Sequence, residues 1–139
     1  MYKALIDSNI FVDFMFHRQP FYNDSEKVIS LCENRIIKGY VTTSMLMDLH
    51  YIFKKLSHSN STANTAISEI MKCFEVIDVE KSDIVTSITN NRKDFEDGVI
   101  ESCSINNRID YIITRNVDDF DGKEIEVLSP NKAITEFKK

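Results

Sequence analysis

The stretch KALIDSNIFVD, residues 3–13, decides the fold of this chain. Its short apolar run, residues 3–6, is typical of a buried strand, and the run ends on Asp7. Ser8 or Asn9 then begins a new apolar pattern that predicts a helix. We therefore expect a buried strand that carries Asp7 to its carboxyl end. Because open α/β sheets bind their ligands at the carboxyl ends of the strands, Asp7 is a candidate site residue.

The composition is that of an ordinary globular protein. The chain has 139 residues, of which 42% are hydrophobic and 28% are charged, with only 3 Gly and 2 Pro. This length suits one domain, which we expect to span residues 1–139. The formal net charge of -5 disfavours a protein that coats DNA with a basic face. It does not exclude a nuclease, because a carboxylate-lined metal site itself adds negative charge.

The cysteines and the hydropathy indicate a cytoplasmic protein. Cys32, Cys73 and Cys103 are odd in number and form no CxxC pair. We therefore expect three buried, reduced thiols rather than disulfides or a zinc site. Because the first strand begins at residue 3, we expect no signal peptide, and the sequence has no apolar run long enough to span a bilayer. We expect no membrane partner.

Short apolar strands alternate with amphipathic helices along the rest of the chain. Strands are expected at residues 3–6, 40–43, 75–79, 111–114 and 125–128, with helices between them and a last helix from Pro130. Gly39 is predicted to end the second helix, which would extend to residue 37. The alternation predicts an α/β fold, a three-layer α/β/α arrangement with a mostly parallel central sheet of about five strands.

Several acidic side chains are expected near the carboxyl edge of this sheet. They are Asp7, Asp48, Asp94, Asp97, Glu101, Asp118 and Asp119. Each has an ordinary alternative as a helix cap, a first-turn residue or a solvated charge, and solvated surface is the favoured interpretation for Glu101. Clustered carboxylates repel one another and are tolerated chiefly beside a divalent cation. Because carboxylates offer only oxygen atoms as ligands, they favour Mg²⁺ or Mn²⁺ over zinc. The acidic side chains therefore predict a metal-dependent site that cleaves phosphoryl bonds.

Three blocks of the sequence resemble the PIN domain family. LIDSNI at residues 5–10 resembles the family's opening, DFEDGVI at 94–100 its second-half helix, and DYIITRNVDDF at 110–120 its closing block. PIN domains are small α/β nucleases, and many are VapC-like ribonuclease toxins of toxin–antitoxin pairs. The resemblance implies a PIN-like fold and a Mg²⁺- or Mn²⁺-dependent endoribonuclease that cleaves RNA phosphodiester bonds. It also implies an antitoxin as a protein partner.

Residue by residue, the resemblance implies a catalytic set of four acids, Asp7, Asp48, Asp97 and Asp119. Asp7, Asp97 and Asp119 match the metal ligands. The residues implied to support the site or contact substrate are Asn9, Asp94, Thr114, Arg115 and Asn116. In two departures from the family pattern, Asp48 stands where Glu is usual and Gly98 stands where Ala is common. Neither departure removes an acid, so we expect an active enzyme.

Two other functions remain open. One is a non-catalytic PIN-fold module that binds RNA or protein. The other is a phosphatase of the haloacid dehalogenase type, whose aspartate nucleophile also ends the first strand. That phosphatase class requires a second Asp at the position that Asn9 occupies here. It also requires a Lys in its later motifs, and we can assign no Lys of this sequence to that role.

Few basic residues are placed to bind phosphate. Besides Arg115, the candidates are the pairs His17-Arg18 and Lys54-Lys55, each of which could equally be a plain solvated charge. So few basic residues predict a modest intrinsic affinity for RNA. The apolar helices after Phe21 and after Ser44 either cover the sheet alone or supply a surface for a homodimer or an antitoxin segment.

Overall fold

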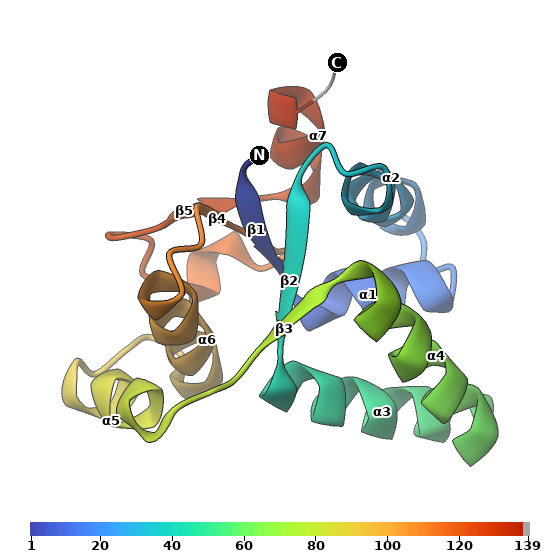
Figure 1. Ribbon diagram of the computed structural model, residues 1–139, viewed down its shortest axis with the longest axis horizontal. Helices are drawn as coiled ribbons and strands as arrows, with labels where there is room; N and C mark the ends of the chain where they lie inside the picture. The colour runs from blue at the N-terminus through green and yellow to red at the C-terminus, as the bar shows by residue number, and fades with distance from the viewer. Residues whose placement is uncertain (138–139) are drawn as a thin grey trace.

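A parallel sheet forms the centre of the protein in the computed structural model, which describes residues 1–137 (Figure 1). The strands are ordered β3-β2-β1-β4-β5, and every neighbouring pair is parallel. Their bounds are Lys3–Ile6 for β1, Lys38–Thr42 for β2, Glu75–Ile77 for β3, Tyr111–Ile113 for β4 and Glu126–Leu128 for β5. The five strands confirm the sheet that the sequence predicts.

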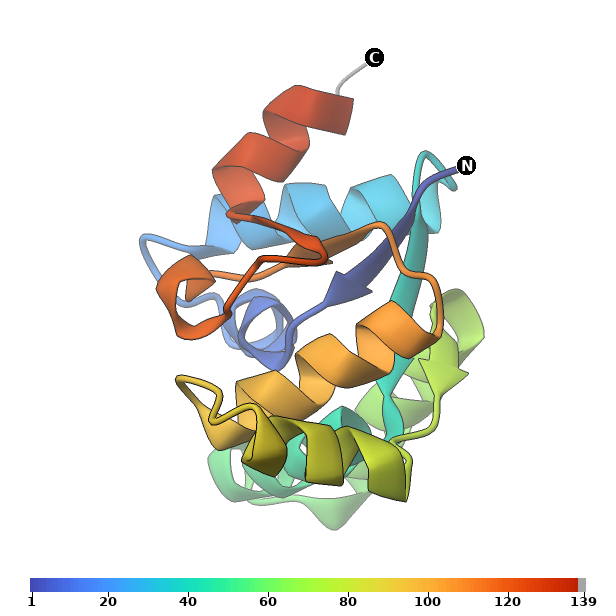
Figure 2. The ribbon, with the colours of Figure 1, turned by 90° about the vertical axis from the view of Figure 1, so that its left-hand side faces the viewer.

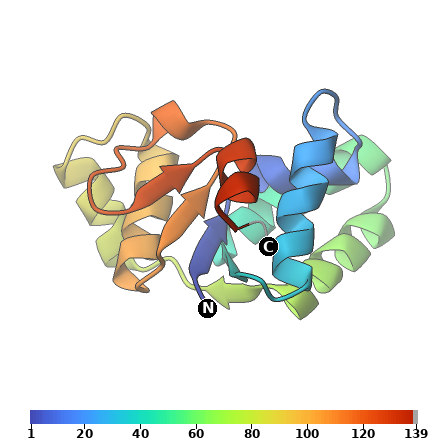
Figure 3. The ribbon, with the colours of Figure 1, turned by 90° about the horizontal axis from the view of Figure 1, so that it is seen from above.

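Helices cover both faces of this sheet. They are α1 (Ser8–Met15), α2 (Tyr22–Glu33), α3 (Thr43–Ser57), α4 (Asn60–Cys73), α5 (Lys81–Thr89), α6 (Phe95–Asn106) and α7 (Pro130–Phe137), with a 3₁₀ turn, η1, at Val117–Asp119. Figure 1 shows α1, α2 and α4 on one side and α5 and α6 on the other, and Figure 3 shows the same layers from above. This is the predicted α/β/α arrangement. Within residues 1–137, no helix combines the length and the apolar character that crossing a membrane requires.

The neighbouring strands β1 and β4 place the residues that follow them, Asp7 and Thr114, side by side. Leu5 and Ile6 of β1 pair with Ile112 and Ile113 of β4, and all four side chains are 0% exposed. Strands buried on both faces consist of continuous apolar runs, which explains the ALI and II segments. The chain continues from these strands into Asp7 and Thr114. Figures 1 and 2 place the N-terminus and α7 at the opposite end of the sheet.

The second helix ends earlier than the sequence predicts, and Gly39 has a different role. Helix α2 ends at Glu33, and Gly39 lies inside β2 rather than at a helix end. A Cβ atom on Gly39 would lie 2.5 Å from the Phe74 ring and 2.8 Å from Sγ of Cys32. Glycine is needed here because buried side chains pack directly against the strand backbone. Arg35, with φ 57°, makes the turn after the helix instead.

The cysteines are free, but only two of them are buried. Cys32 and Cys103 are buried, and burial raises the pKa of each thiol to about 12. Both therefore remain protonated and unreactive at neutral pH. Cys73 is exposed at the end of α4, which corrects the prediction that all three are buried.

Candidate active site

Asp7 stands at the carboxyl end of β1, where the chain enters α1. Its Oδ1 accepts a hydrogen bond from the backbone N–H of Ser8 at 2.8 Å, so the side chain also caps the helix. Its Oδ2 accepts a hydrogen bond from Oγ1 of Thr114 at 2.7 Å. Burial raises the pKa of Asp7; the hydrogen bonds from Thr114 and Ser8 oppose this shift, and the charge of Asp119 adds to it. Asp7 is thus a buried carboxylate that faces the end of the neighbouring strand.

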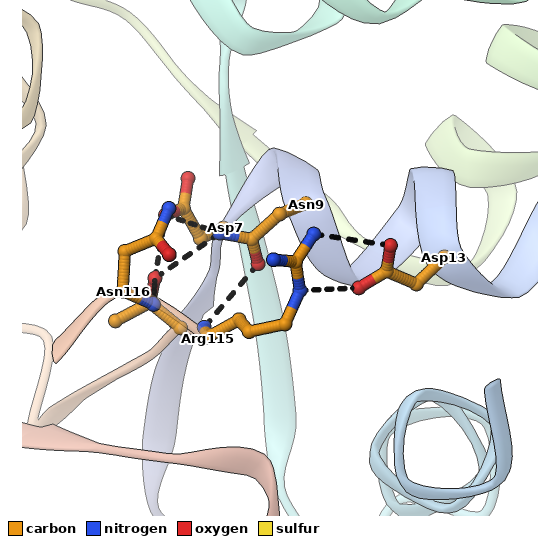
Figure 4. Close-up of polar contacts among 6 residues, drawn as sticks. Asp7, Asn9, Asp13, Arg115 and Asn116 are labelled. Atoms are coloured by element: carbon orange, nitrogen blue, oxygen red, sulfur yellow. Dashed lines mark hydrogen bonds and ion pairs between the residues drawn. The ribbon is translucent and has the colours of Figure 1, made fainter. Parts of the chain in front are cut away.

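The polar residues expected around Asp7 form a network with it (Figure 4). The Asn9 amide Nδ2 lies 3.4 Å from both Oδ2 of Asp7 and Oγ1 of Thr114. The Asn9 Oδ1 accepts a hydrogen bond from the backbone N–H of Arg115 at 3.3 Å, and Oγ1 of Thr114 accepts one from the backbone N–H of Asn116 at 3.0 Å. The segment after β4 is therefore attached to the first turn of α1 beside Asp7.

Asp97 lies in the first turn of α6 and approaches the site from the other side of the sheet. Its backbone N–H donates to Oδ1 of Asp94, which caps this helix, at 3.0 Å. Partial burial raises the pKa of Asp97 to about 7, helped by the charges of Asp7, Asp94 and Asp119. Asp7 and Asp97 line the same clefts, and Asp119, from a third element, is near enough for its charge to raise the pKa of both.

Asp119 and Asp48 are the most exposed of the four predicted acids. Asp119 ends η1, where its backbone N–H donates to the carbonyl oxygen of Asn116 at 3.0 Å. Asp48, in the second turn of α3, lines a cleft of about 300 Å³ together with Asp7 and Asp97. Asp119 is among the charges that raise the pKa values of Asp7 and Asp97, and Asp48 is not. Asp48 is thus joined to Asp7 and Asp97 by the cleft that they share, and Asp119 by the effect of its charge on their pKa values.

The acidic cluster suits a hard divalent cation in its chemistry. Within residues 1–137, no three His, Cys, Asp or Glu side chains are already gathered closely enough to hold a metal ion. The donors Asp7, Asp97 and Asp119 supply only oxygen atoms, and they carry charges that repel one another. Asp97 is partly exposed and Asp119 is exposed, so both side chains have room to turn toward a shared ion.

Arg115 is held by a buried acid, Asp13, that the sequence analysis missed. Its Nε donates to Oδ2 of Asp13 at 2.7 Å and an Nη donates to Oδ1 at 3.2 Å, a bidentate pair (Figure 4). Asp13 is 0% exposed, and the guanidinium group lies 4.0 Å from the centre of the Phe21 ring. These contacts make Arg115 a structural link between α1 and the end of β4. An acid inside the apolar run of α1 was the signal that could have revealed it.

Glu101 is buried, and this corrects the prediction of a solvated surface residue. Its side chain is 1% exposed, and its two carboxylate oxygens accept hydrogen bonds from the backbone N–H groups of Asp121 and Gly122, at 3.0 and 2.9 Å. It thereby holds the segment that directly follows η1 and Asp119. The sequence pattern misled because α6 is buried on nearly every side, from Gly98 to Ser104.

The glycine that follows Asp97 has a packing role. A Cβ atom on Gly98 would collide with Oγ of Ser87 and lie 2.6 Å from Cγ of Arg92, because α5 and its following loop pack closely on α6. Glycine instead of the alanine of the family pattern therefore allows α5 and its following loop to approach α6 this closely. It does not alter the acidic cluster.

The layered fold and the acids at the carboxyl edge of its sheet define the class of this protein. The sequence profile of the PIN domain matches residues 3–118. The chain belongs to the PIN domain family. This membership confirms the resemblance and disfavours the haloacid dehalogenase alternative. No curated protein matches the sequence significantly.

Solved structures with the same fold include several toxin–antitoxin proteins. A toxin–antitoxin complex from Klebsiella pneumoniae is 21% identical, with a TM-score of 0.67, over 91% of this chain and 97% of that one. VapBC-1 from nontypeable Haemophilus influenzae is 17% identical, with a TM-score of 0.66, over 92% and 98%. Mycobacterium tuberculosis VapC20, a toxin that cleaves the sarcin–ricin loop, is 9% identical, with a TM-score of 0.63, over 78% and 86%. At these identities, the likeness concerns the fold.

Proposed function

We propose that residues 1–139 form one nuclease domain, a Mg²⁺- or Mn²⁺-dependent endoribonuclease that cleaves RNA phosphodiester bonds. The observation that carries this proposal is the cleft of about 300 Å³ at the carboxyl edge of the sheet that Asp7, Asp48 and Asp97 line together, with Asp119 near enough for its charge to raise the pKa of Asp7 and of Asp97. Such an arrangement is unfavourable for the protein alone and becomes favourable when a cation binds. Membership of the PIN family supports the same activity.

Asp7, Asp97 and Asp119 would hold the cation, and Asp48 would complete the acidic rim. A bound divalent cation supplies neutralisation of the scissile phosphate and a lower pKa for the attacking water. Thr114 and Ser8 fix the carboxylate of Asp7 through hydrogen bonds at 2.7 and 2.8 Å. Asp94 holds the first turn of α6, and Asn9 and Thr114 hold the backbone after β4, so the segments that carry the acids are fixed while the side chains of Asp97 and Asp119 would still turn toward the ion.

The decisive experiment compares RNA cleavage by the wild type and by Asp97→Asn, with Mg²⁺, with Mn²⁺ and with EDTA. We expect cleavage by the wild type only with a metal ion and a loss of about 100-fold or more in the variant. Asp118→Asn is a matched control, because Asp118 is the exposed neighbour of Asp119 in η1. Equal cleavage by wild type and Asp97→Asn would refute the nuclease. RNA binding without any cleavage would instead favour the non-catalytic binding module.

We further propose that this nuclease is the toxin of a toxin–antitoxin pair, acting in the cytoplasm. The support is that proteins of the same fold are solved as toxin–antitoxin complexes, including those from Klebsiella pneumoniae and Haemophilus influenzae. Expression of the wild type alone should then arrest growth, whereas Asp97→Asn should not. Growth at the same rate with both proteins, at equal expression, would contradict the toxin role.

A further inference from the structure

A second cleft leads away from the acidic cluster along α3. It has a volume of about 440 Å³ and shares Asp7 and Asp97 with the candidate active site. Its remaining lining includes Tyr51 and Lys55 of α3 and Arg18 of the turn after α1. We call it the Tyr51 cleft. Because the two clefts share these acids, a polymer whose phosphate lies at Asp7 and Asp97 has this space for its next nucleotides.

One face of α3 connects the acids to the far end of the Tyr51 cleft. Asp48, Tyr51 and Lys55 are spaced i, i+3, i+7, so they lie on one side of the helix. The rise of an α-helix places Lys55 about 10 Å beyond Asp48 along the axis. Tyr51 is 66% exposed, and the neighbouring Leu56 is 40% exposed. An aromatic ring exposed beside apolar surface is a platform on which a nucleobase can stack.

A second cation in the lining of the cleft comes from the turn after α1. Arg18 follows α1, which packs against α3, and its backbone N–H donates to the carbonyl oxygen of Asp13 at 3.0 Å. Its side chain is exposed, as is that of Lys55. Neither takes part in the ion pairs formed among residues 1–137, unlike Arg115, which is paired with Asp13. Both cations line the Tyr51 cleft and are thus available to the phosphate groups of a strand bound there.

We propose that the Tyr51 cleft binds the single-stranded RNA segment adjoining the scissile phosphate, with a base stacked on Tyr51 and phosphates bound by Lys55 and Arg18. This inference rests on the proposed ribonuclease function and names the side chains that would hold the nucleotides next to the scissile phosphate. Single-stranded RNA fits because only unpaired bases offer their faces for stacking. The net charge of -5 makes such local cations decisive, because the chain as a whole repels a polyanion.

The test measures binding of a fluorescein-labelled RNA without internal pairing, by anisotropy in EDTA, where cleavage is absent. Tyr51→Ala should weaken binding about tenfold, whereas Tyr51→Phe should bind as the wild type does, because stacking needs only the ring. The logarithm of the binding constant falls linearly as the logarithm of the salt concentration rises. Lys55→Gln and Arg18→Gln should each make this slope less steep by about 0.7, the value for one phosphate contact on a single strand. A duplex of the same sequence should bind more weakly than the single strand.

Two neighbours on α3 provide matched controls. Lys54 and Met47 are exposed on the same helix but do not line the Tyr51 cleft. Lys54→Gln and Met47→Ala should therefore leave the affinity and the salt slope unchanged. A loss in Lys54→Gln equal to that in Lys55→Gln would overturn the proposal, since it would indicate a general charge effect. A loss in Tyr51→Phe equal to that in Tyr51→Ala would overturn the stacking contact.

Cleavage with Mn²⁺ separates this inference from the proposed function. If the wild type cleaves RNA and the Tyr51, Lys55 and Arg18 variants bind and cleave as it does, RNA binding in the Tyr51 cleft is refuted and the nuclease activity is supported. If these variants lose binding but the wild type cleaves nothing, RNA binding in the Tyr51 cleft is supported and the nuclease activity is refuted. If the wild type neither binds nor cleaves single-stranded RNA, both are overturned. Circular dichroism melting of each variant confirms that it is folded.

Discussion

Asp97 is the residue at which the electrostatics of the acidic cluster can be measured most directly. Its pKa is about 7 in the folded protein, against an ordinary value of 3.8, because it is partly buried among other carboxylates. Between these two values the folded state retains a proton that the unfolded state has lost. The folded state then binds more protons, so stability falls as pH rises from about 4 to about 7 and stays lower above that range.

Asp97→Asn should therefore stabilise the metal-free protein at pH 8 and leave it nearly unchanged at pH 4. The expected gain in the free energy of unfolding at pH 8 is about 2 kcal/mol, after allowance for the solvent that reaches this side chain. Thermal or urea unfolding of both proteins in EDTA at the two pH values measures it. Asp118→Asn, changed in the same way, should show no such gain. A variant less stable than the wild type at pH 8 would contradict the repulsion.

At the scale of elements, the ion pair between Asp13 and Arg115 joins α1 to the end of β4. Asp13→Asn should lower the free energy of unfolding by about 2 kcal/mol, because it removes a buried carboxylate that accepts two hydrogen bonds from a charged donor. It should also reduce RNA cleavage, since the backbone of Arg115 is held beside Asn9 and Asp7. Urea unfolding and cleavage rates measure the two effects.

The double variant Asp13→Asn with Arg115→Gln distinguishes this pair from simple packing. Once both charges are absent, no unpaired charge remains, and much of the lost stability should return. If the double variant loses the sum of the two single losses, the residues are not coupled, and the proposed link between α1 and β4 is wrong.

At the scale of the whole molecule, local patterns predict the order of elements and the edge at which the acids gather. The apolar runs before Asp7 and Thr114 identify β1 and β4, and parallel strands place their ends together. What depends on tertiary packing could not be predicted in this way. Glu101 forms its contacts with residues 20 and 21 positions along the chain, and Gly39 is required by the distant ring of Phe74. Such contacts leave no periodic signal in the sequence.

Because the acids come from separate elements, a cation that binds them should stabilise the whole fold. At 100 times its dissociation constant, Mn²⁺ should add about 2.7 kcal/mol to the free energy of unfolding at pH 8, roughly 10 °C in Tm for a chain of this size. The shift should shrink at pH 5.5, where the proton on Asp97 competes with the ion. Asp119→Asn should lose most of the shift and Asp118→Asn should keep it, as differential scanning fluorimetry can show. Equal shifts in these two neighbours would mean that Asp119 does not hold the ion, because only Asp119 of the pair raises the pKa of Asp7 and of Asp97.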